Sequence, residues 1–309
     1  MNFNETSETV MTKILLTGGT GFIGSALSKR LVAQNYKVTL LARHPETVGK
    51  LGLESVHVLG SLSELTSDDH FQVIINLAGE PIFDARWTDV RKQLIRDSRI
   101  NLTEQLVAYI ARMTVKPALL ISGSAIGYYG DQGDTVITES SAVKADFPQQ
   151  LCADWEQAAN KAEQLGVRVC LIRTGLVLGE GGLLKRMLLP FQLGLGGRLG
   201  NGAQWMSWIH LHDWLSIAER MITDHSMSGA YNATAPNPVI NAEFTKVLAK
   251  TLNRPALLPV PASLLILLLG EMSGLVLGSQ RALPERLQAQ GFSFKYTDLA
   301  TALIQIIKR

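Results

Sequence analysis

Apolar runs alternate with amphipathic segments along the first half of the chain. Short apolar runs typical of buried strands occur at five places: Lys13–Thr17, Lys37–Leu41, Val73–Leu77, Ala118–Ser122 and Val167–Ile172. Between them, apolar residues recur at helical spacing, as in Phe22–Gln34, Ile95–Met113 and Gln149–Leu165. Strands that alternate with helices predict an α/β fold built on a doubly wound parallel sheet.

The second half of the chain has a different composition. Residues 175–202 are rich in glycine, and prolines recur beyond Gly229. The change predicts a Rossmann domain at residues 13–174 and a small C-terminal α/β substrate domain at residues 175–309, with segments that return to the Rossmann core. Residues 1–12 are predicted to form an N-terminal extension, because they lack the basic start and the apolar run of a secretory signal.

Charge and cysteine content exclude several classes of function. The formal net charge of +2 over 309 residues is too small for the extended positive field that nucleic acid or anionic membranes require. Cys152 and Cys170 are the only cysteines, so neither a disulfide framework nor a multi-cysteine zinc site is expected, and a cytoplasmic location is the simpler assumption. The most apolar segment, Leu264–Leu269, is too short to cross a membrane and is predicted to be a buried helix.

A glycine run marks a candidate binding site. Gly18, Gly21 and Gly24 follow the first predicted strand directly and open the first predicted helix. Backbone amides and the helix dipole at such a position can hold a pyrophosphate, whereas an ordinary turn with a close helix contact is the alternative. The other cofactor contacts predicted in this turn are Thr20, Phe22 and Ile23.

Arg43 at the end of the second predicted strand indicates the type of dinucleotide. An NAD-selective site usually has an acidic residue at this point, where it binds the ribose hydroxyls. A guanidinium instead forms charge-assisted bonds with the 2′-phosphate of NADP, so NADP(H) is the predicted cofactor. The alternative is a solvated arginine, and His44 is expected to be a surface residue or a minor adenine contact.

Four further motifs resemble the extended short-chain dehydrogenase/reductase superfamily. They are Asn76–Gly79, Ser122–Ser124, Arg173–Gly179 and Trp208–Asp213. The resemblance implies an NAD(P)-binding Rossmann fold, with additional cofactor contacts at Leu77, Ala78, Gly79, Ser122 and Leu176. It also includes Arg99, which could reach cofactor phosphates; the alternative is that Arg91, Arg96 and Arg99 form the solvated face of an amphipathic helix.

A subfamily resemblance extends over nearly the whole chain. Ser124–Gly130, Leu151–Glu156, Gly194–Gly197, Asn232–Pro238 and Leu283–Leu287 are similar to the NAD-dependent epimerase/dehydratase subfamily of the cell-division-inhibitor type. The resemblance implies an oxidoreductase or epimerase that acts on a carbonyl or alcohol carbon of a small molecule, with nucleotide sugars as a candidate class. It also implies a homodimer, as in many relatives.

The usual acid/base pair of the superfamily is absent. That pair is Tyr-x-x-x-Lys, in which the tyrosine exchanges a proton and the lysine holds the ribose and lowers the tyrosine pKa. Cys152 and Glu156 align with the two positions. A thiol donor beside a carboxylate is one interpretation, although the carboxylate would raise the thiol pKa.

Two other interpretations stay open. Tyr128 or Tyr129 could supply a phenol from a different direction, with Ser124 positioning the carbonyl. Alternatively, Cys152 is a small buried hydrophobe with Trp155 packed beneath it, and Glu156 is solvated. The absent pair also motivates a second function class, a non-catalytic NADP(H)-dependent sensor or regulatory binding protein.

The motif Trp208–Asp213 also raises the question of a metal site. His210 and Asp213 begin a predicted helix that extends through Arg220, but these ligand types without further partners make a poor site, and no metal is expected. The resemblance implies that this segment ties the two domains together by hydrogen bonds. The residues predicted to line a substrate pocket are Arg198, Gln204 and Trp205.

Overall fold

The computed structural model describes residues 11–54 and 56–308, so most of the predicted extension at residues 1–12 lies outside the described residues. Its centre is one parallel sheet, ordered β11-β7-β5-β4-β1-β2-β3. The strands are β1 (Lys13–Thr17), β2 (Lys37–Leu41), β3 (His57–Leu59), β4 (Val73–Asn76), β5 (Leu119–Ala125), β7 (Arg168–Thr174) and β11 (Gly229–Ala233). The five predicted strands and the doubly wound α/β Rossmann fold are confirmed.

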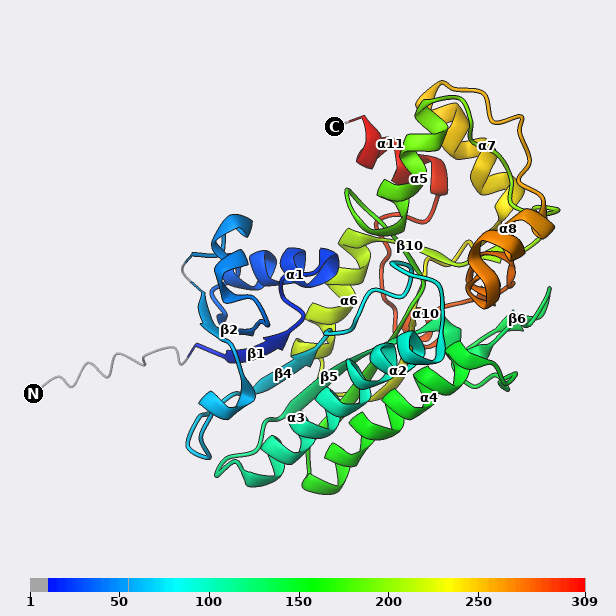
Figure 1. Ribbon diagram of the computed structural model, residues 1–309. Coiled ribbons are helices and arrows are strands. Elements are labelled where there is room, and N and C mark those ends of the chain that lie inside the picture. The colour runs from blue at the N-terminus through cyan, green and yellow to red at the C-terminus, as the bar shows by residue number, and fades with distance from the viewer. Residues whose placement is uncertain (1–10, 55, 309) are drawn as a thin grey trace, which may run out of the picture.

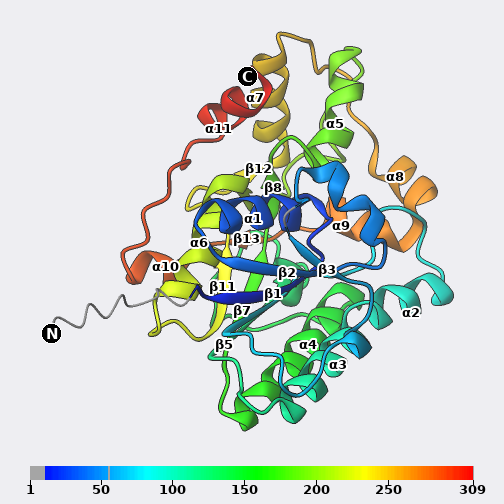
Figure 2. The same ribbon diagram turned by 90° about the vertical axis from the view of Figure 1, so that its left-hand side faces the viewer.

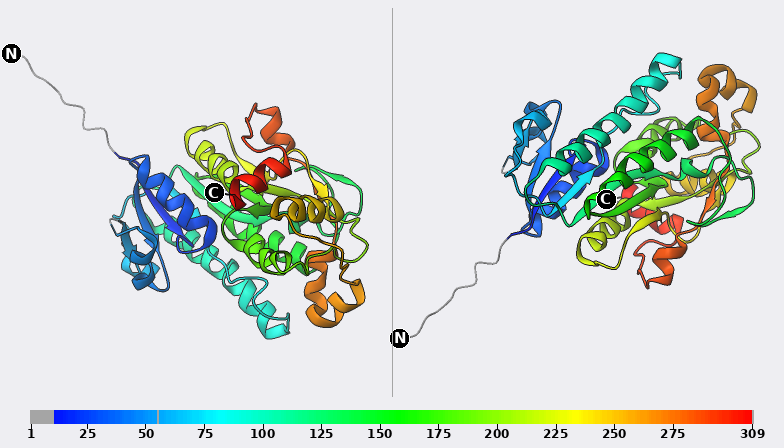
Figure 3. Two further views of the ribbon diagram at one scale, coloured as in Figure 1. Left: turned by 90° about the horizontal axis from the view of Figure 1, so that it is seen from above. Right: turned by 90° about the horizontal axis from the view of Figure 1, so that it is seen from below.

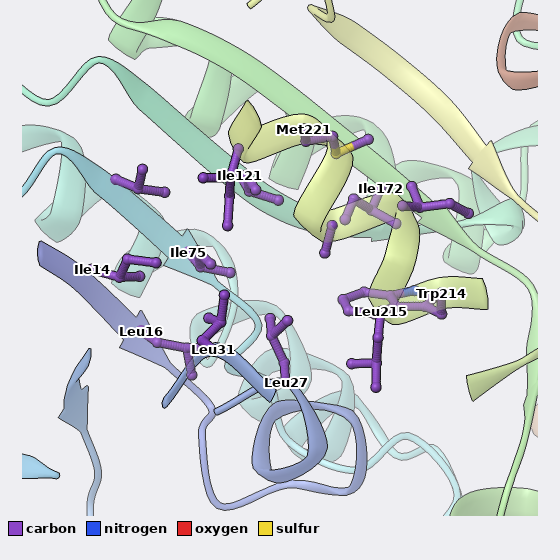
Figure 4. Close-up of a cluster of buried hydrophobic side chains, with 14 of the residues drawn as sticks. Ile14, Leu16, Leu27, Leu31, Ile75, Ile121, Ile172, Trp214, Leu215 and Met221 are labelled. Carbon is purple, nitrogen blue, oxygen red and sulfur yellow. The ribbon is translucent and has the colours of Figure 1, made fainter. Parts of the chain in front are cut away.

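Helices cover both faces of this sheet (Figure 2). One layer contains α1 (Phe22–Ala33) and α6 (Leu211–Thr223), and the other contains α3 (Ile100–Arg112) and α4 (Phe147–Asn160). Successive strand residues point to opposite faces, so β1 contributes to the packing of both layers. Ile14 and Leu16 pack with α1 and α6, as Figure 4 shows, whereas Leu15 packs with α3.

The predicted helix Ile95–Met113 is wrong in one respect, because the structure divides it. α2 (Asp89–Asp97) ends at Ser98, and α3 begins after Arg99. The Ser98 hydroxyl donates to the Ile95 carbonyl and accepts the backbone N–H of Glu80, so polar contacts replace the continuous helix here. The other two predicted helices correspond to α1 and to α4 with its short 3₁₀ continuation.

The second half of the chain builds a layer beyond the carboxyl edge of the sheet, seen at the upper right of Figure 1. Its core packs around Trp208, which has no exposed surface. The small strands are β6 (Val136–Ile137), β8 (Leu176–Leu178), β9 (Trp205–Met206), β10 (Trp208–His210), β12 (Val239–Ile240) and β13 (Arg281–Ala282). The helices are α5 (Gly182–Gln192), α7 (Asn241–Leu252), α8 (Ala262–Leu269), α9 (Gly274–Leu277), α10 (Glu285–Ala289) and α11 (Leu299–Ile307). In the described residues there are also six 3₁₀ helices: Pro45–Thr47, Gly49–Leu51, Leu62–Glu64, Ile126–Tyr129, Lys161–Leu165 and Gly270–Ser273.

The prediction that Leu264–Leu269 is a buried helix is wrong about burial. The segment is helical as α8, and Leu265 is buried, but Ile266 is 54% and Leu267 is 71% exposed. The helix is apolar on every side, so one turn of contact with the domain cannot cover it. Figure 3 shows α8, in orange, far from the blue β1–α1 unit. Within residues 11–54 and 56–308, no helix has the length and apolar character needed to span a membrane.

Candidate cofactor and catalytic site

The glycine run forms a tight turn between β1 and α1. Gly18 adopts φ +74°, and a Cβ there would lie 2.6 Å from the backbone carbon of Leu77. A Cβ on Gly24 would lie 2.1 Å from the carbonyl oxygen of Gly18. Only glycine therefore allows this approach of backbone to backbone, and Gly21 then directs the first amides of α1 toward the carboxyl edge of the sheet.

The segment after β4 is fixed against this turn. The Thr17 hydroxyl donates to the Asn76 side chain at 2.7 Å and accepts the Ala78 backbone N–H at 3.3 Å. The predicted contacts at Gly18, Leu77 and Ala78 are thus brought together. Phe22 at the start of α1 lies beneath the glycines at 179–182, where a Cβ on Gly181 would meet its ring at 2.5 Å.

Arg43 extends from the end of β2 into solvent, with its side chain 77% exposed. Both of its terminal nitrogens donate to Oε2 of Glu80 at 3.2 Å. Oε1 of the same carboxylate accepts from Nη1 of Arg91 at 3.4 Å. Glu80 therefore links two arginines beside the glycine turn.

Arg99 lies at the same edge, between α2 and α3. Its guanidinium packs against Gly79, where an added Cβ would be 2.8 Å from the guanidinium carbon. Burial lowers the pKa of Arg99, and the Glu80 carboxylate opposes that shift. Because Arg91 is only 14% exposed and Arg99 packs against Gly79, the interpretation of both as part of a solvated helix face is wrong.

The chemistry expected on α4 is replaced by a buried ion pair. Glu156 lies where the superfamily has lysine, and Arg173 on β7 binds it through two bonds: Nε to Oε1 at 2.8 Å and Nη2 to Oε2 at 2.7 Å. Ser124 on β5 donates its hydroxyl proton to Oε1 at 2.6 Å. The interpretation of Glu156 as solvated is therefore wrong, and its carboxylate is fully engaged by protein groups.

Tyr129 belongs to the same buried network. Its side chain has no exposed surface, and its hydroxyl donates to Oδ1 of Asn232 at 2.6 Å while accepting from Nη1 of Arg173 at 2.9 Å. Burial raises the pKa of Tyr129 to about 12, although Arg173 favours the phenolate. Tyr129 is therefore held as a neutral structural phenol.

Tyr128 has a different environment from its neighbour. Its ring lies over the Arg173 guanidinium, with the guanidinium carbon 3.5 Å from the ring centroid, and is only partly buried. The Tyr128 and Tyr129 rings meet edge to face with centroids 5.4 Å apart. Of the two candidate phenols, only Tyr128 has a partly accessible side chain. It contacts Arg173, which binds the same carboxylate oxygen of Glu156 as Ser124 does.

Cys152 is buried on α4, and its thiol is unsuited to proton exchange. Burial, followed by the charge of Glu156, raises the pKa of Cys152 to about 12. The predicted burial of Cys152 agrees with the structure, and Trp155 packs its ring against Gly123 on β5 and donates its N–H to the Thr103 hydroxyl at 3.1 Å. The predicted cofactor contact Ser122 is also buried within β5.

Sequence reasoning did not select Arg173, Asn232 or Glu80. Arg173 follows the buried apolar residues 169–172 near the end of β7, and a buried charge requires a partner, which is a signal for an ion pair. Asn232 and Glu80 gave no comparable signal, because each acts through a residue distant in sequence.

The residues predicted for the substrate pocket are divided. Gln204 is buried and donates its amide to the carbonyls of Leu199 and Val276, so it supports backbone. Trp205 stacks on Arg281, with the guanidinium carbon 4.2 Å from the ring centroid, and presents an aromatic and cationic surface. Arg198 is exposed.

The segment Trp208–Asp213 ties parts of the chain together, as its resemblance implied. His210 caps α6 and stacks on Tyr296 at a centroid distance of 3.9 Å. Asp213 is buried and accepts the backbone N–H groups of Lys295 and Tyr296, both at 2.9 Å. In the described part of the chain, no cluster of three or more His, Cys, Asp or Glu side chains could hold a metal ion.

Comparisons with known proteins agree with this geometry. A model of the NAD dependent epimerase/dehydratase family matches residues 14–233, and a domain of unknown function, DUF1731, matches residues 260–306. Epimerase family protein YfhF of Bacillus subtilis is 40% identical over 296 residues, which cover 95% of this chain and 97% of the relative. Epimerase family protein SAR0825 of Staphylococcus aureus is 37% identical over 301 residues, 97% of this chain and 100% of the relative.

Two solved structures are similar over 96% of this chain. Human epimerase family protein SDR39U1 (isoform 2), solved with NADPH, is 30% identical with a TM-score of 0.87 and is covered completely. The nucleoside-diphosphate sugar epimerase from Corynebacterium glutamicum is 33% identical with a TM-score of 0.78 and is covered to 58%. The chain belongs to the NAD dependent epimerase/dehydratase family.

Proposed function

We propose that this protein binds NADPH across the carboxyl edge of its sheet. The observation that carries the proposal is the glycine turn, where the absence of Cβ atoms at Gly18 and Gly24 lets backbone pack closely against backbone at the amino end of α1, whose first amides can hold a pyrophosphate. Arg43 supplies an exposed guanidinium for a 2′-phosphate. The similarity to a human relative solved with NADPH supports the same choice.

Titration of the purified protein with NADPH and NADH tests the cofactor. We expect tighter binding of NADPH, and Arg43→Asp should weaken NADPH binding more than NADH binding, because the carboxylate repels the 2′-phosphate. Equal losses for the two cofactors would contradict the role of Arg43.

For the reaction, we propose reduction or epimerisation at a carbonyl or alcohol carbon of a small molecule. Bound NADPH would supply the hydride for a reduction, whereas in an epimerisation bound NADP⁺ would take up the substrate hydride and return it to the same carbon. Ser124 positions the alcohol form of the substrate: its hydroxyl donates its only proton to Glu156, so its oxygen can accept a hydrogen bond from a substrate hydroxyl. Tyr128 exchanges the proton, held by its stacking on Arg173. Nucleotide sugars are the proposed substrate class, in line with the Corynebacterium relative, and the cell-division-inhibitor subtype remains a prediction.

The reaction is tested with NADPH deuterated at the transferable carbon and a small-molecule cell extract. Mass spectrometry should detect a deuterated product, and Tyr128→Phe should lower its rate of formation by about 10²-fold or more while leaving NADPH affinity unchanged. Tyr36→Phe, a change of the same size on a partly buried tyrosine after α1, is the matched control. An unchanged rate in Tyr128→Phe would remove this tyrosine from the mechanism.

A second candidate is a non-catalytic NADPH sensor. The buried Glu156–Arg173 pair favours it, because the positions that usually carry the acid/base pair serve structure instead. In that case NADPH binds, no deuterated product forms, and the Tyr128→Phe variant is indistinguishable from wild type. An epimerase that returns the hydride to the same molecule would incorporate no deuterium. It is detected instead by inversion of the configuration at one carbon of the substrate.

A further inference from the structure

Glu80 occupies an unusual position for an acidic residue in a site that binds phosphates. It follows Gly79 at the carboxyl end of β4, and its backbone N–H is fixed by the Ser98 hydroxyl at 2.9 Å. Its side chain is only 20% exposed. The carboxylate therefore cannot swing freely away from the phosphate-binding edge of the sheet.

The contacts of Glu80 are those that an anionic ligand would make. Oε2 accepts both terminal nitrogens of Arg43 at 3.2 Å, and Oε1 accepts Nη1 of Arg91 at 3.4 Å. A phosphate oxygen would bind the same forked donors of Arg43. A carboxylate and a dianionic phosphate cannot both take these donors without mutual repulsion.

Arg91 gives the carboxylate a second anchor. Its side chain is 14% exposed, it donates to the Pro81 carbonyl, and its Nε is buried without a hydrogen-bond partner among the described residues. Arg91 is thus fixed in place, and its Nε–H group could donate a further hydrogen bond. When Arg43 turns away, Glu80 keeps one cation and is not left unpaired.

We propose that Glu80 is an internal competitor for the 2′-phosphate site, which it occupies as an anion by pairing with Arg43 and from which a ligand phosphate displaces it toward Arg91. The proposal rests on the NADPH binding proposed above. It assigns Glu80 and Arg91 as determinants of the preference between NADPH and NADH, because only the phosphorylated cofactor must break the Arg43–Glu80 pair.

The test compares NADPH and NADH dissociation constants for the wild type and Glu80→Gln at one fixed salt concentration. The amide keeps the size of the side chain and removes its charge. We expect NADPH to bind about tenfold more tightly to Glu80→Gln, because the 2′-phosphate no longer competes with a carboxylate for the Arg43 guanidinium. The affinity for NADH should change by less than about twofold. Glu80→Ala, which also removes the charge, should show the same direction of change and provides a second variant if the amide fails to fold.

Two controls isolate the contact from general charge. Glu46→Gln removes a negative charge from the segment just after Arg43, where Glu46 is 69% exposed and pairs with His44, and should leave both affinities within about twofold of wild type. In Arg43→Met the gain from Glu80→Gln should disappear, because the competed donors are gone. Arg91→Met should weaken NADPH binding in the wild type but not in Glu80→Gln.

The failures are distinguishable. If the wild type binds neither cofactor, the proposed function fails and this inference fails with it. If the wild type prefers NADPH and Arg43→Met loses that preference, but Glu80→Gln binds NADPH equally or more weakly, only the competition is wrong. If Glu80→Gln binds NADPH more weakly than the wild type does, Glu80 would be a positioning residue that holds Arg43 for the phosphate.

Discussion

At β1, β2 and β4 the carboxyl edge of the sheet carries glycines and the exposed Arg43, whereas at β5 and β7 the same edge carries a buried ion pair. The first end is formed by backbone that approaches backbone at Gly18 and Gly24. The second is formed by Ser124, Glu156 and Arg173, whose polar atoms are satisfied by one another. At the first end the Arg43 guanidinium is exposed to solvent. At the second end the hydrogen-bond donors of Ser124 and Arg173 bind Glu156 within the fold.

The two ends thus differ in what their residues contact: the first has the glycine turn proposed to hold the dinucleotide, whereas at the second the position aligned with the usual lysine is bound within the fold. At the first end, Gly18 and Gly24 cannot be replaced by another residue without strain, because any Cβ there would clash with the backbone. At the second end, a change from lysine to glutamate on α4 is compatible with the fold because Arg173 on β7 supplies the opposite charge.

The largest expected effect comes from breaking the buried pair. Glu156→Ala leaves the Arg173 guanidinium buried without its counter-charge, so we expect a loss of about 3–5 kcal/mol in the free energy of unfolding. Urea denaturation followed by circular dichroism measures the change. The matched control is Glu104→Ala, since Glu104 pairs with Lys161 in an ion pair about half exposed on each side and should cost less than about 1 kcal/mol.

A comparable loss for both glutamates would contradict the contrast between the buried and the exposed pair. The double variant Glu156→Leu, Arg173→Met sharpens the test, because it removes both charges and refills the space with apolar groups. Its stability should lie closer to wild type than that of Glu156→Ala.

At the glycine end, the corresponding change is Gly24→Ala. Replacing a glycine inside a helix by alanine normally raises the free energy of unfolding by about 0.5–1 kcal/mol. Here the new Cβ would lie 2.1 Å from the Gly18 carbonyl oxygen, so we expect a destabilisation of about 2–3 kcal/mol and weaker NADPH binding. Gly274→Ala in α9, where no neighbouring atom lies within 4 Å of the added Cβ, should be neutral or stabilising in the same urea denaturation.

The sequence predicts the first end better than the second for a physical reason. Gly18, Gly21, Gly24 and Arg43 act through local geometry, since each lies at a turn or strand end whose position follows from the hydrophobic pattern. Glu156 and Arg173 are 17 residues apart, on α4 and on β7, and their pairing depends on how α4 packs against the sheet. Sequence spacing alone therefore left the solvated and the catalytic interpretations of Glu156 open.

The same limit explains the error on α8. The run Leu264–Leu269 is as apolar as a core helix, but burial depends on how much partner surface the rest of the chain brings to it. The helix contributes Leu265 to the interior and leaves Ile266, Leu267 and Leu268 exposed. Composition predicted the element and could not predict its surroundings.

A comparison of Cys152→Ala with the wild type at alkaline pH reports on the buried end. The pKa of Cys152 is raised from 9.0 to about 12 by burial, so the thiol is protonated in the folded chain while the unfolded chain ionises first. Its contribution to stability is therefore complete below about pH 9 and is lost as pH rises toward 12. For one proton the slope is about 1.4 kcal/mol per pH unit. Cys152→Ala should reduce the slope of unfolding free energy against pH over this range, and an unchanged slope would show that the thiol is not shielded.

The smallest expected effect is on the stability of the exposed pair at the glycine end. Arg43→Met breaks two hydrogen bonds to Glu80, yet Arg43 is 77% exposed, and solvent and salt screen its charge. We expect a change below about 1 kcal/mol in the free energy of unfolding, together with a clear loss of NADPH affinity. Arg173→Met, the same substitution at the buried end, should instead unfold at much lower urea concentration, because Glu156 loses both of its arginine bonds. If the two arginine variants lost stability equally, burial would not be what separates the two ends of the sheet edge; if Arg43→Met lost neither stability nor NADPH affinity, the exposed arginine would have no role at this site.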